Sequence, residues 1–250
     1  MQKRSFILSV VLLSGLTAFA QRDDGFEVGR IDSKNLLQIG PKFGATITSM
    51  GQPDEVSLYD GSGIAFSGGI AFRARFNTAT ENSDSGTGLL GAGLELKYKM
   101  NTVKTIATDE SGKENADLSI GYFEVPLFVQ IYPFYKTKAM NTFYIEAGPD
   151  FAGIISRKPK SLTVDNLPGE YSSVTYHIDD DKSTLKGMDV RVMAGIGYDF
   201  PIKNSSNKTA SLIGINARYY MGTSNLAGNF NSKMNTLELS LSWMFNISKF

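Results

Sequence analysis

The charged residues of this chain are sorted onto one side of its apolar, strand-length segments. On 63–77, large apolar residues such as Phe66 and Phe72 hold even positions, whereas Arg73 and Arg75 hold odd ones. Successive side chains of a β-strand point to opposite faces, so this alternation predicts a strand with one apolar and one polar wall. The same pattern recurs on 36–48, 88–100, 118–132, 142–155, 188–202, 210–222 and 234–246. We therefore expect an all-β chain of eight strands.

The polar walls of these segments carry equal numbers of both signs of charge, and no charge falls on an apolar wall. The basic members are Lys42, Arg73, Arg75, Lys97, Lys99, Arg191 and Arg218, and the acidic members are Glu95, Glu124, Glu146, Asp150, Asp189, Asp199 and Glu238. Buried charges are tolerated only when paired, so the balance predicts mutual neutralisation. The structural network that we expect comprises Arg73, Arg75, Glu124, Glu146, Asp150, Arg191, Arg218 and Glu238.

Strand length and side-chain size indicate which wall faces inward. Segments of about 13–15 residues exceed the usual strand of roughly 5–6 residues and cover the roughly 9–11 that a tilted membrane strand needs. The narrow interior of an eight-stranded barrel suits small side chains. The polar walls contain the glycines Gly44, Gly69, Gly91, Gly93, Gly121, Gly148, Gly195, Gly197 and Gly214. A soluble lipocalin-like barrel would share the alternation, but these features favour an eight-stranded antiparallel transmembrane β-barrel with a polar, filled interior.

Aromatic residues gather near one end of the predicted strands, as an interfacial girdle requires. They are Phe76, Tyr132, Phe134, Phe143, Phe200, Trp243 and Phe245. The connections alternate in length, as is usual for long outer loops and short periplasmic turns. We expect outer connections at 49–62, 101–117, 156–187 and 223–233, and periplasmic ones at 78–87, 133–141 and 203–209.

The amino terminus has the three parts of a secretory signal peptide: a basic start, a short apolar stretch and an A-x-A end. The apolar stretch falls short of the roughly 18 residues of a spanning helix, so a membrane anchor is the weaker interpretation. We predict a signal peptide over 1–20, a periplasmic lead-in over 21–35 and the barrel over 36–250.

Composition excludes several kinds of chemistry. The chain has no cysteine, which excludes disulfides, thiolate metal sites and a cysteine nucleophile. Its one histidine, His177, offers little for a histidine-rich metal site. With 25 basic and 25 acidic residues, the chain gives no electrostatic support for binding nucleic acid. We expect no cofactor, no metal and no nucleic-acid partner.

The connection 156–187 holds His177 and the acidic run 179–181, which could form a cation site or a docking loop. The run lacks the alternating oxygen ligands and glycine of a calcium loop, so a solvated surface loop is the better interpretation. Lipid A-modifying barrel enzymes need a nucleophile with a histidine base. No G-x-S-x-G or H-x-S arrangement occurs here, and we expect a non-enzyme.

Several segments share their order and spacing with a known family. They are YFEVPL at 122–127, FYIEAGP at 143–149, AGIGY at 194–198, ARYYMG at 217–222, and the closing stretch 235–245. From about residue 36 onward the chain resembles the outer membrane protein beta-barrel domain family, often labelled PorT-like. The resemblance implies an outer-membrane barrel without catalytic residues, in a family whose name derives from a barrel needed for type IX protein secretion.

These features predict a non-enzymatic outer-membrane protein that is structural or accessory to a secretion or surface machine. Its expected partners are outer-membrane lipid and secretion or surface proteins. A narrow pore for small solutes or ions and a lipid-modifying enzyme are the alternatives.

Overall fold

The computed structural model describes residues 36–50, 59–76, 88–105, 107–109, 111–135, 137, 140–164, 174–177, 187–203, 209–223 and 233–247. The predicted signal peptide and periplasmic lead-in lie outside these residues. Among the described residues, no helix has the length and apolar character needed to cross a membrane.

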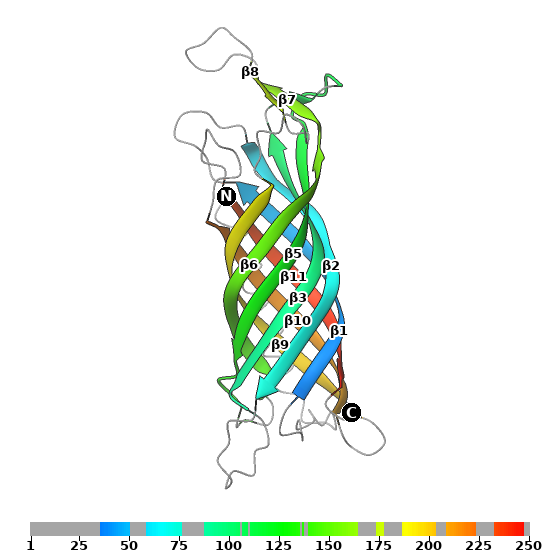
Figure 1. The fold of residues 1–250 in the computed structure, drawn as a ribbon, viewed down its shortest axis with the longest axis vertical. Helices are drawn as coiled ribbons and strands as arrows, with labels where there is room; N and C mark the ends of the chain where they lie inside the picture. The colour runs from blue at the N-terminus through cyan, green and yellow to red at the C-terminus, as the bar shows by residue number, and fades with distance from the viewer. Residues whose placement is uncertain are drawn as a thin grey trace, which may run out of the picture.

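Eight long strands form a closed antiparallel barrel (Figure 1). They are β1 Leu36–Met50, β2 Tyr59–Phe76, β3 Leu90–Thr105, β5 Asp117–Ile131, β6 Phe143–Lys158, β9 Met188–Lys203, β10 Thr209–Gly222 and β11 Met234–Asn246. Around the wall they follow the order β1-β11-β10-β9-β6-β5-β3-β2, and pairing of β1 with both β2 and β11 closes the ring. Closure leaves no sheet edge with unpaired backbone groups. The predicted all-β, eight-stranded fold is confirmed.

Three short strands form a second sheet beyond one end of the barrel (Figure 1). They are β4 Thr108–Asp109, β7 Ser161–Val164 and β8 Val174–His177, in the order β4-β7-β8. The predicted outer connections over 101–117 and 156–187 therefore contain short strands that the sequence pattern did not predict, and these strands pair with each other. This end carries the connections that the sequence predicts to lie outside, so we name it the outer end and the opposite end the periplasmic end.

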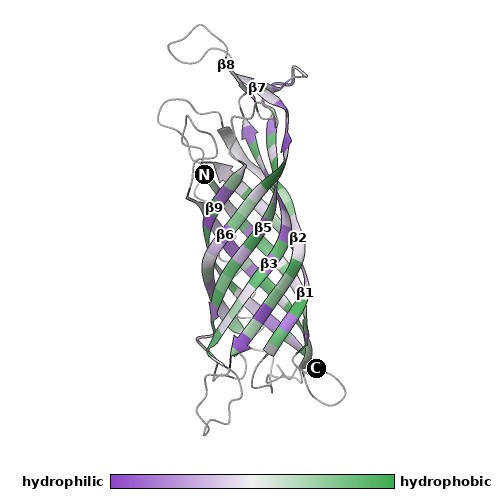
Figure 2. Cartoon of the chain, in the orientation of Figure 1, coloured by the Kyte–Doolittle hydropathy of each residue, from purple (hydrophilic) through white to green (hydrophobic). Residues whose placement is uncertain are grey.

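Hydrophilic and hydrophobic residues follow one another along the barrel strands (Figure 2), and their exposure shows that the two walls differ as predicted. Large apolar side chains point outward, and Ile64 and Phe66 are 75% and 66% exposed. Charged side chains of the same strands point inward, and Arg73 and Arg75 are 5% and 6% exposed. A continuous apolar outer wall is unfavourable in water and favourable in contact with lipid.

Glycine is required where two strand backbones approach closely. A Cβ atom on Gly148 would lie 1.9 Å from the carbonyl oxygen of Leu127, across the seam between β5 and β6. The β5–β6 ladder is interrupted at this point, between the Pro126↔Asp150 and Val129↔Ala147 pairs, without a change of register. Proline lacks the N–H that a sheet ladder needs.

Gly121 does not lie on the inner wall, contrary to the prediction. A Cβ atom there would lie 2.7 Å from the hydroxyl of Tyr98, whose side chain faces outward and is 44% exposed. The reason is the alternation itself, because Gly121 has the opposite parity to the buried Glu124 of the same strand.

The aromatic end of the barrel is only partly as predicted. Phe76, Phe134, Trp243 and Phe245 are exposed near this end, and the Trp243 and Phe245 rings lie 5.1 Å apart. Tyr132 is buried, and its assignment to the girdle was wrong. It follows the even, inward parity of β5, and its ring packs inside the barrel mouth.

The apolar outer wall predicts that a charge added to it destabilises the barrel, by an amount that depends on its depth in the membrane. Leu94 lies near the middle of the outward-facing apolar stretch of β3. We expect Leu94→Arg to lower the free energy of unfolding by about 2–4 kcal/mol, because the bilayer midplane is the costliest place for a cation. Thr102→Arg, nearer the outer edge of the same wall, is the control and should cost about 0–1 kcal/mol. Urea unfolding in lipid vesicles measures both, and equal losses would contradict a membrane-spanning wall.

Candidate functional site

The barrel interior holds the densest polar cluster among the described residues. Seven basic and seven acidic side chains are buried there, and these are the fourteen charges assigned to the polar walls. Of the eight residues expected in the network, seven form ion pairs: Arg73, Glu124, Glu146, Asp150, Arg191, Arg218 and Glu238. Arg75 instead bonds to backbone carbonyls. The strands bring the charges together in three layers along the barrel axis.

The middle layer is centred on Arg218 of β10. Its Nε lies 2.5 Å from Oε1 of Glu146, and its Nη1 lies 2.7 Å from Oε2 of Glu95. Lys42 adds a second cation 3.0 Å from Glu95. The side-chain amide of Asn216 donates a hydrogen bond of 2.7 Å to Glu146. Two cations and two carboxylates therefore neutralise one another in this layer.

The outer layer is built around Arg191 of β9. One nitrogen of its guanidinium pairs with both Glu124 and Asp150, and the distance to Asp150 is 2.5 Å. Lys97 lies 2.9 Å from Glu238 and 3.4 Å from Glu124. Lys99 and Asp189 complete the layer, which thus contains three basic and four acidic side chains.

Tyr220 is the aromatic centre of the outer layer. Lys97 donates a hydrogen bond of 2.6 Å to its hydroxyl, and the Lys99 ammonium lies 3.5 Å from its ring centroid. Arg191 lies 5.4 Å from the same centroid. An aromatic face stabilises a nearby cation, so Tyr220 helps to hold three buried positive charges.

The periplasmic layer joins the barrel to its turns. Arg73 lies 3.0 Å from Asp199 across the lumen. Arg75 donates hydrogen bonds of 2.9 Å to the carbonyl oxygens of Gly88 and Asn141, and it stacks 3.6 Å above the Tyr132 ring. Since Gly88 and Asn141 belong to different connections, Arg75 fixes two periplasmic turns against the barrel mouth.

Sequence reasoning missed the aromatic residues of the interior. They are Tyr122, Phe128, Tyr132, Tyr144 and Tyr220, and all are buried. The signal was present in the parity of each strand, because Tyr220 shares the face of Arg218 and Tyr144 shares that of Glu146. These rings were nevertheless not predicted to lie inside, because bulky aromatic side chains were expected to contact lipid.

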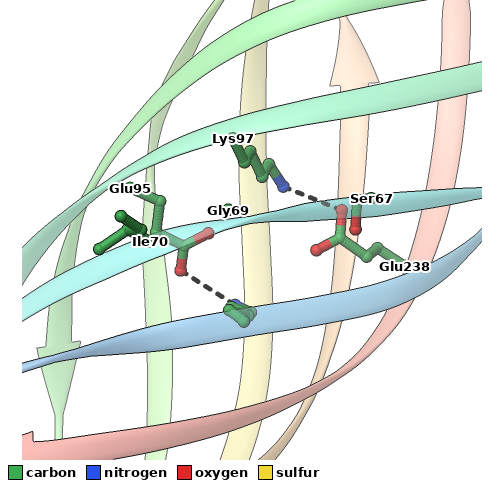
Figure 3. A pocket seen from close by; sticks show the side chains of 7 residues that line it. Ser67, Gly69, Ile70, Glu95, Lys97 and Glu238 are labelled. Atoms are coloured by element: carbon green, nitrogen blue, oxygen red, sulfur yellow. Dashed lines mark hydrogen bonds and ion pairs between the residues drawn. The ribbon is translucent and has the colours of Figure 1, made fainter.

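Side chains pack closely where the middle and outer layers meet beside Gly69. Figure 3 shows the gap between the Lys42–Glu95 and Lys97–Glu238 pairs, where Gly69 contributes no side chain. This gap leaves no volume that admits a water-sized sphere. The described residues contain no group of three or more histidine, cysteine or acidic side chains placed to hold a metal ion.

The candidate residues of the long outer connection lie apart from the barrel interior. His177 ends β8 and is exposed, and the register of the outer sheet places it opposite Ser161 of β7. A search for local motifs could not find this pair, because the two residues lie sixteen positions apart. The acidic run 179–181 lies outside the described residues.

A second outer connection forms an ordered turn around Asp109. Its carboxylate accepts hydrogen bonds from the Ser111 hydroxyl at 2.5 Å and from the backbone N–H groups of Ser111 and Lys113 at 2.9 and 3.0 Å. These bonds, led by the Ser111 hydroxyl, hold the pKa of Asp109 below its ordinary value of 3.8. The turn is therefore stabilised at neutral pH and weakened as the carboxylate becomes protonated in acid.

The pairing of Arg218 predicts a large loss of stability when it is removed. Arg218→Leu leaves the buried Glu146 carboxylate without its guanidinium, and we expect the free energy of unfolding to fall by about 3–5 kcal/mol. The urea midpoint should fall accordingly. The double variant Arg218→Leu/Glu146→Leu should recover part of the loss, because no unpaired charge remains. Lys233→Leu, at an exposed position, is the control. An unchanged midpoint for Arg218→Leu would argue against a paired interior.

Comparison with solved structures returns small outer-membrane barrels. Neisserial surface protein A is 14% identical, with a TM-score of 0.39 over 84% of this chain and 97% of that chain. OprG from Pseudomonas aeruginosa is 14% identical, with a TM-score of 0.41 over 88% and 99%. Ail of Yersinia pestis, in complex with the heparin analogue sucrose octasulfate, is 13% identical, with a TM-score of 0.36 over 84% and 99%.

Sequence comparison gives the firmer assignment. No curated protein matches the chain. A model of the family described as "Outer membrane protein beta-barrel domain" matches residues 19–228, which is most of the sequence. The resemblance in the YFEVPL and FYIEAGP segments is thereby confirmed at the level of the family. The chain belongs to the outer membrane protein beta-barrel domain family and is an outer-membrane β-barrel protein.

Proposed function

We propose that this outer-membrane barrel is non-enzymatic and that its lumen is a structural plug. In this view, the protein acts by binding other molecules at its outer surfaces. In this proposal it is a structural protein or an accessory to a secretion or surface machine. The observation that carries the proposal is the set of contacts that cross the lumen between opposite walls.

Three such contacts occur at different levels. They are Arg73–Asp199 at 3.0 Å, Arg218–Glu95 at 2.7 Å and Lys97–Tyr220 at 2.6 Å. Each joins two strands that lie four steps apart in the eight-stranded ring, so each spans the full width of the barrel. A permeating solute would have to separate buried partners at every level, and an unpaired buried charge costs several kcal/mol.

The outer end offers a surface for a protein partner. The β4-β7-β8 sheet extends beyond the membrane-spanning wall (Figure 1), and Thr163 and Thr175 are joined side by side on it at 3.1 Å. The link to type IX secretion rests only on the resemblance to PorT-like members. We accordingly propose secretion or surface proteins as the class of partner.

A native-detergent pull-down of the tagged protein tests the accessory role. We expect near-stoichiometric recovery of envelope proteins with the unaltered chain. A variant in which 159–187 is replaced by a short Gly-Ser turn should lose that partner, while heat-modifiable migration on gels shows that its barrel still folds. A barrel recovered alone, or equal recovery from both proteins, would contradict an accessory role for the outer sheet.

A narrow pore is the second candidate, because the lumen is polar along most of its length. Planar-bilayer recording distinguishes an open pore from a plugged lumen. We expect no discrete openings from the unaltered protein, and openings from Arg73→Ser/Arg218→Ser, which shortens side chains at two crossings. Reproducible steps from the unaltered protein would overturn the plug.

Lipid modification is the third candidate, and only the Ser161–His177 register pair favours it. Lipid A masses should be the same in strains with and without the protein. A mass change that Ser161→Ala abolishes would overturn the non-enzymatic proposal.

A further inference from the structure

Two lysines stand on the outward-facing wall at the outer end of the barrel. Lys104 of β3 and Lys158 of β6 are both exposed, and β5 lies between their strands. Paired residues of antiparallel strands point to the same side, and Lys158 pairs with Ser119, while Lys104 pairs with Asp117. The buried neighbours of Lys104, Val103 and Thr105, confirm that Lys104 faces outward.

The height of these lysines corresponds to lipid headgroups. On β3, the outward-facing apolar side chains run from Leu90 to Met100, the length of a membrane-spanning strand. Thr102 follows, and Lys104 lies four residues beyond Met100. With a rise of about 3.3 Å per residue and a tilt near 45°, that is roughly 10 Å above the apolar band. Flexible lysine side chains reach down from such positions to the headgroup layer.

Neither ammonium group has an ion-pair partner among the described residues. Asp117 lies opposite Lys104 in the register, yet the two side chains form no ion pair there. This differs from the interior, where each lysine lies within ion-pair distance of a carboxylate. The two outward cations are thus available to an external anion.

The surface between the lysines is polar and can complete an anion site. The hydroxyls of Thr102 and Ser119 lie 3.1 Å apart on the same outward face. Neighbouring strands are about 4.8 Å apart, so β3 and β6 are separated by roughly 10 Å, which two lysine side chains can span. We propose that Lys104 and Lys158, with the Thr102 and Ser119 hydroxyls, bind a phosphate group of an outer-leaflet lipid.

The site would occupy one sector of the barrel. At the outer ends of β1, β9 and β10, the outward-facing described residues include Ile47, Met188 and Met221 and no lysine or arginine. A bound phospholipid headgroup would therefore sit against β3, β5 and β6. These strands also carry the connections to the β4-β7-β8 sheet.

Native mass spectrometry of the full chain in detergent tests the site, with bis-phosphorylated lipid A as the probe. We expect Lys104→Gln/Lys158→Gln to bind this lipid about 25-fold more weakly, since each lysine near an anionic lipid surface contributes about fivefold. Lys104→Arg/Lys158→Arg should retain binding because the charge is kept. Lys233→Gln, another exposed lysine at the outer end, is the matched control and should bind like the unaltered chain.

Two further arms identify the source of the phosphate. Dephosphorylated lipid A should bind as weakly to the unaltered chain as the intact lipid binds to the double glutamine variant. Inorganic phosphate at millimolar concentration should not displace the lipid, and displacement would favour a free anion as the ligand. Equal lipid A binding by the unaltered chain and the folded double glutamine variant would overturn the proposal.

Discussion

Pairing of buried charge is the interaction on which this barrel depends. Fourteen charged side chains point into the lumen, and thirteen of them form ion pairs with one another, whereas Arg75 is held by backbone carbonyls. Arg218 shows the principle, because it joins β10 to Glu146 on β6 and to Glu95 on β3. The interior network therefore ties opposite walls together, in addition to the backbone ladder that joins neighbours.

The distribution of charge along the axis follows from the same requirement. The middle layer is balanced, the outer layer has one extra carboxylate, and the periplasmic layer has one extra cation in Arg75. Arg75 is tolerated because two backbone carbonyls and the Tyr132 ring take the place of a carboxylate. If the lumen is plugged, as we propose, the outer sheet and the lipid-facing rim are the surfaces through which the protein acts on other molecules.

Alternation along single strands was enough to predict the eight strands, their faces and the charged residues inside. The prediction failed where side-chain size was used to infer the environment. Tyr132 was assigned to the aromatic girdle because of its ring, but its position in the alternation places it inside the barrel. The prediction also failed for β4 and β7, because strands of two and four residues show too little periodicity, and the two pair across more than fifty residues of chain. Gly121 was misplaced although the parity of Glu124 already assigned it outward.

The sequence by itself determined which side chains share a face, because backbone pleating imposes a period of two on any strand. It also determined that the interior charges balance, since composition is independent of folding. Only the tertiary structure decided which charge meets which, because strand register and stagger bring Arg73 to Asp199 and Lys97 to Tyr220 across the barrel. The rim that places Lys104 near Lys158 likewise arises only when β5 aligns β3 with β6.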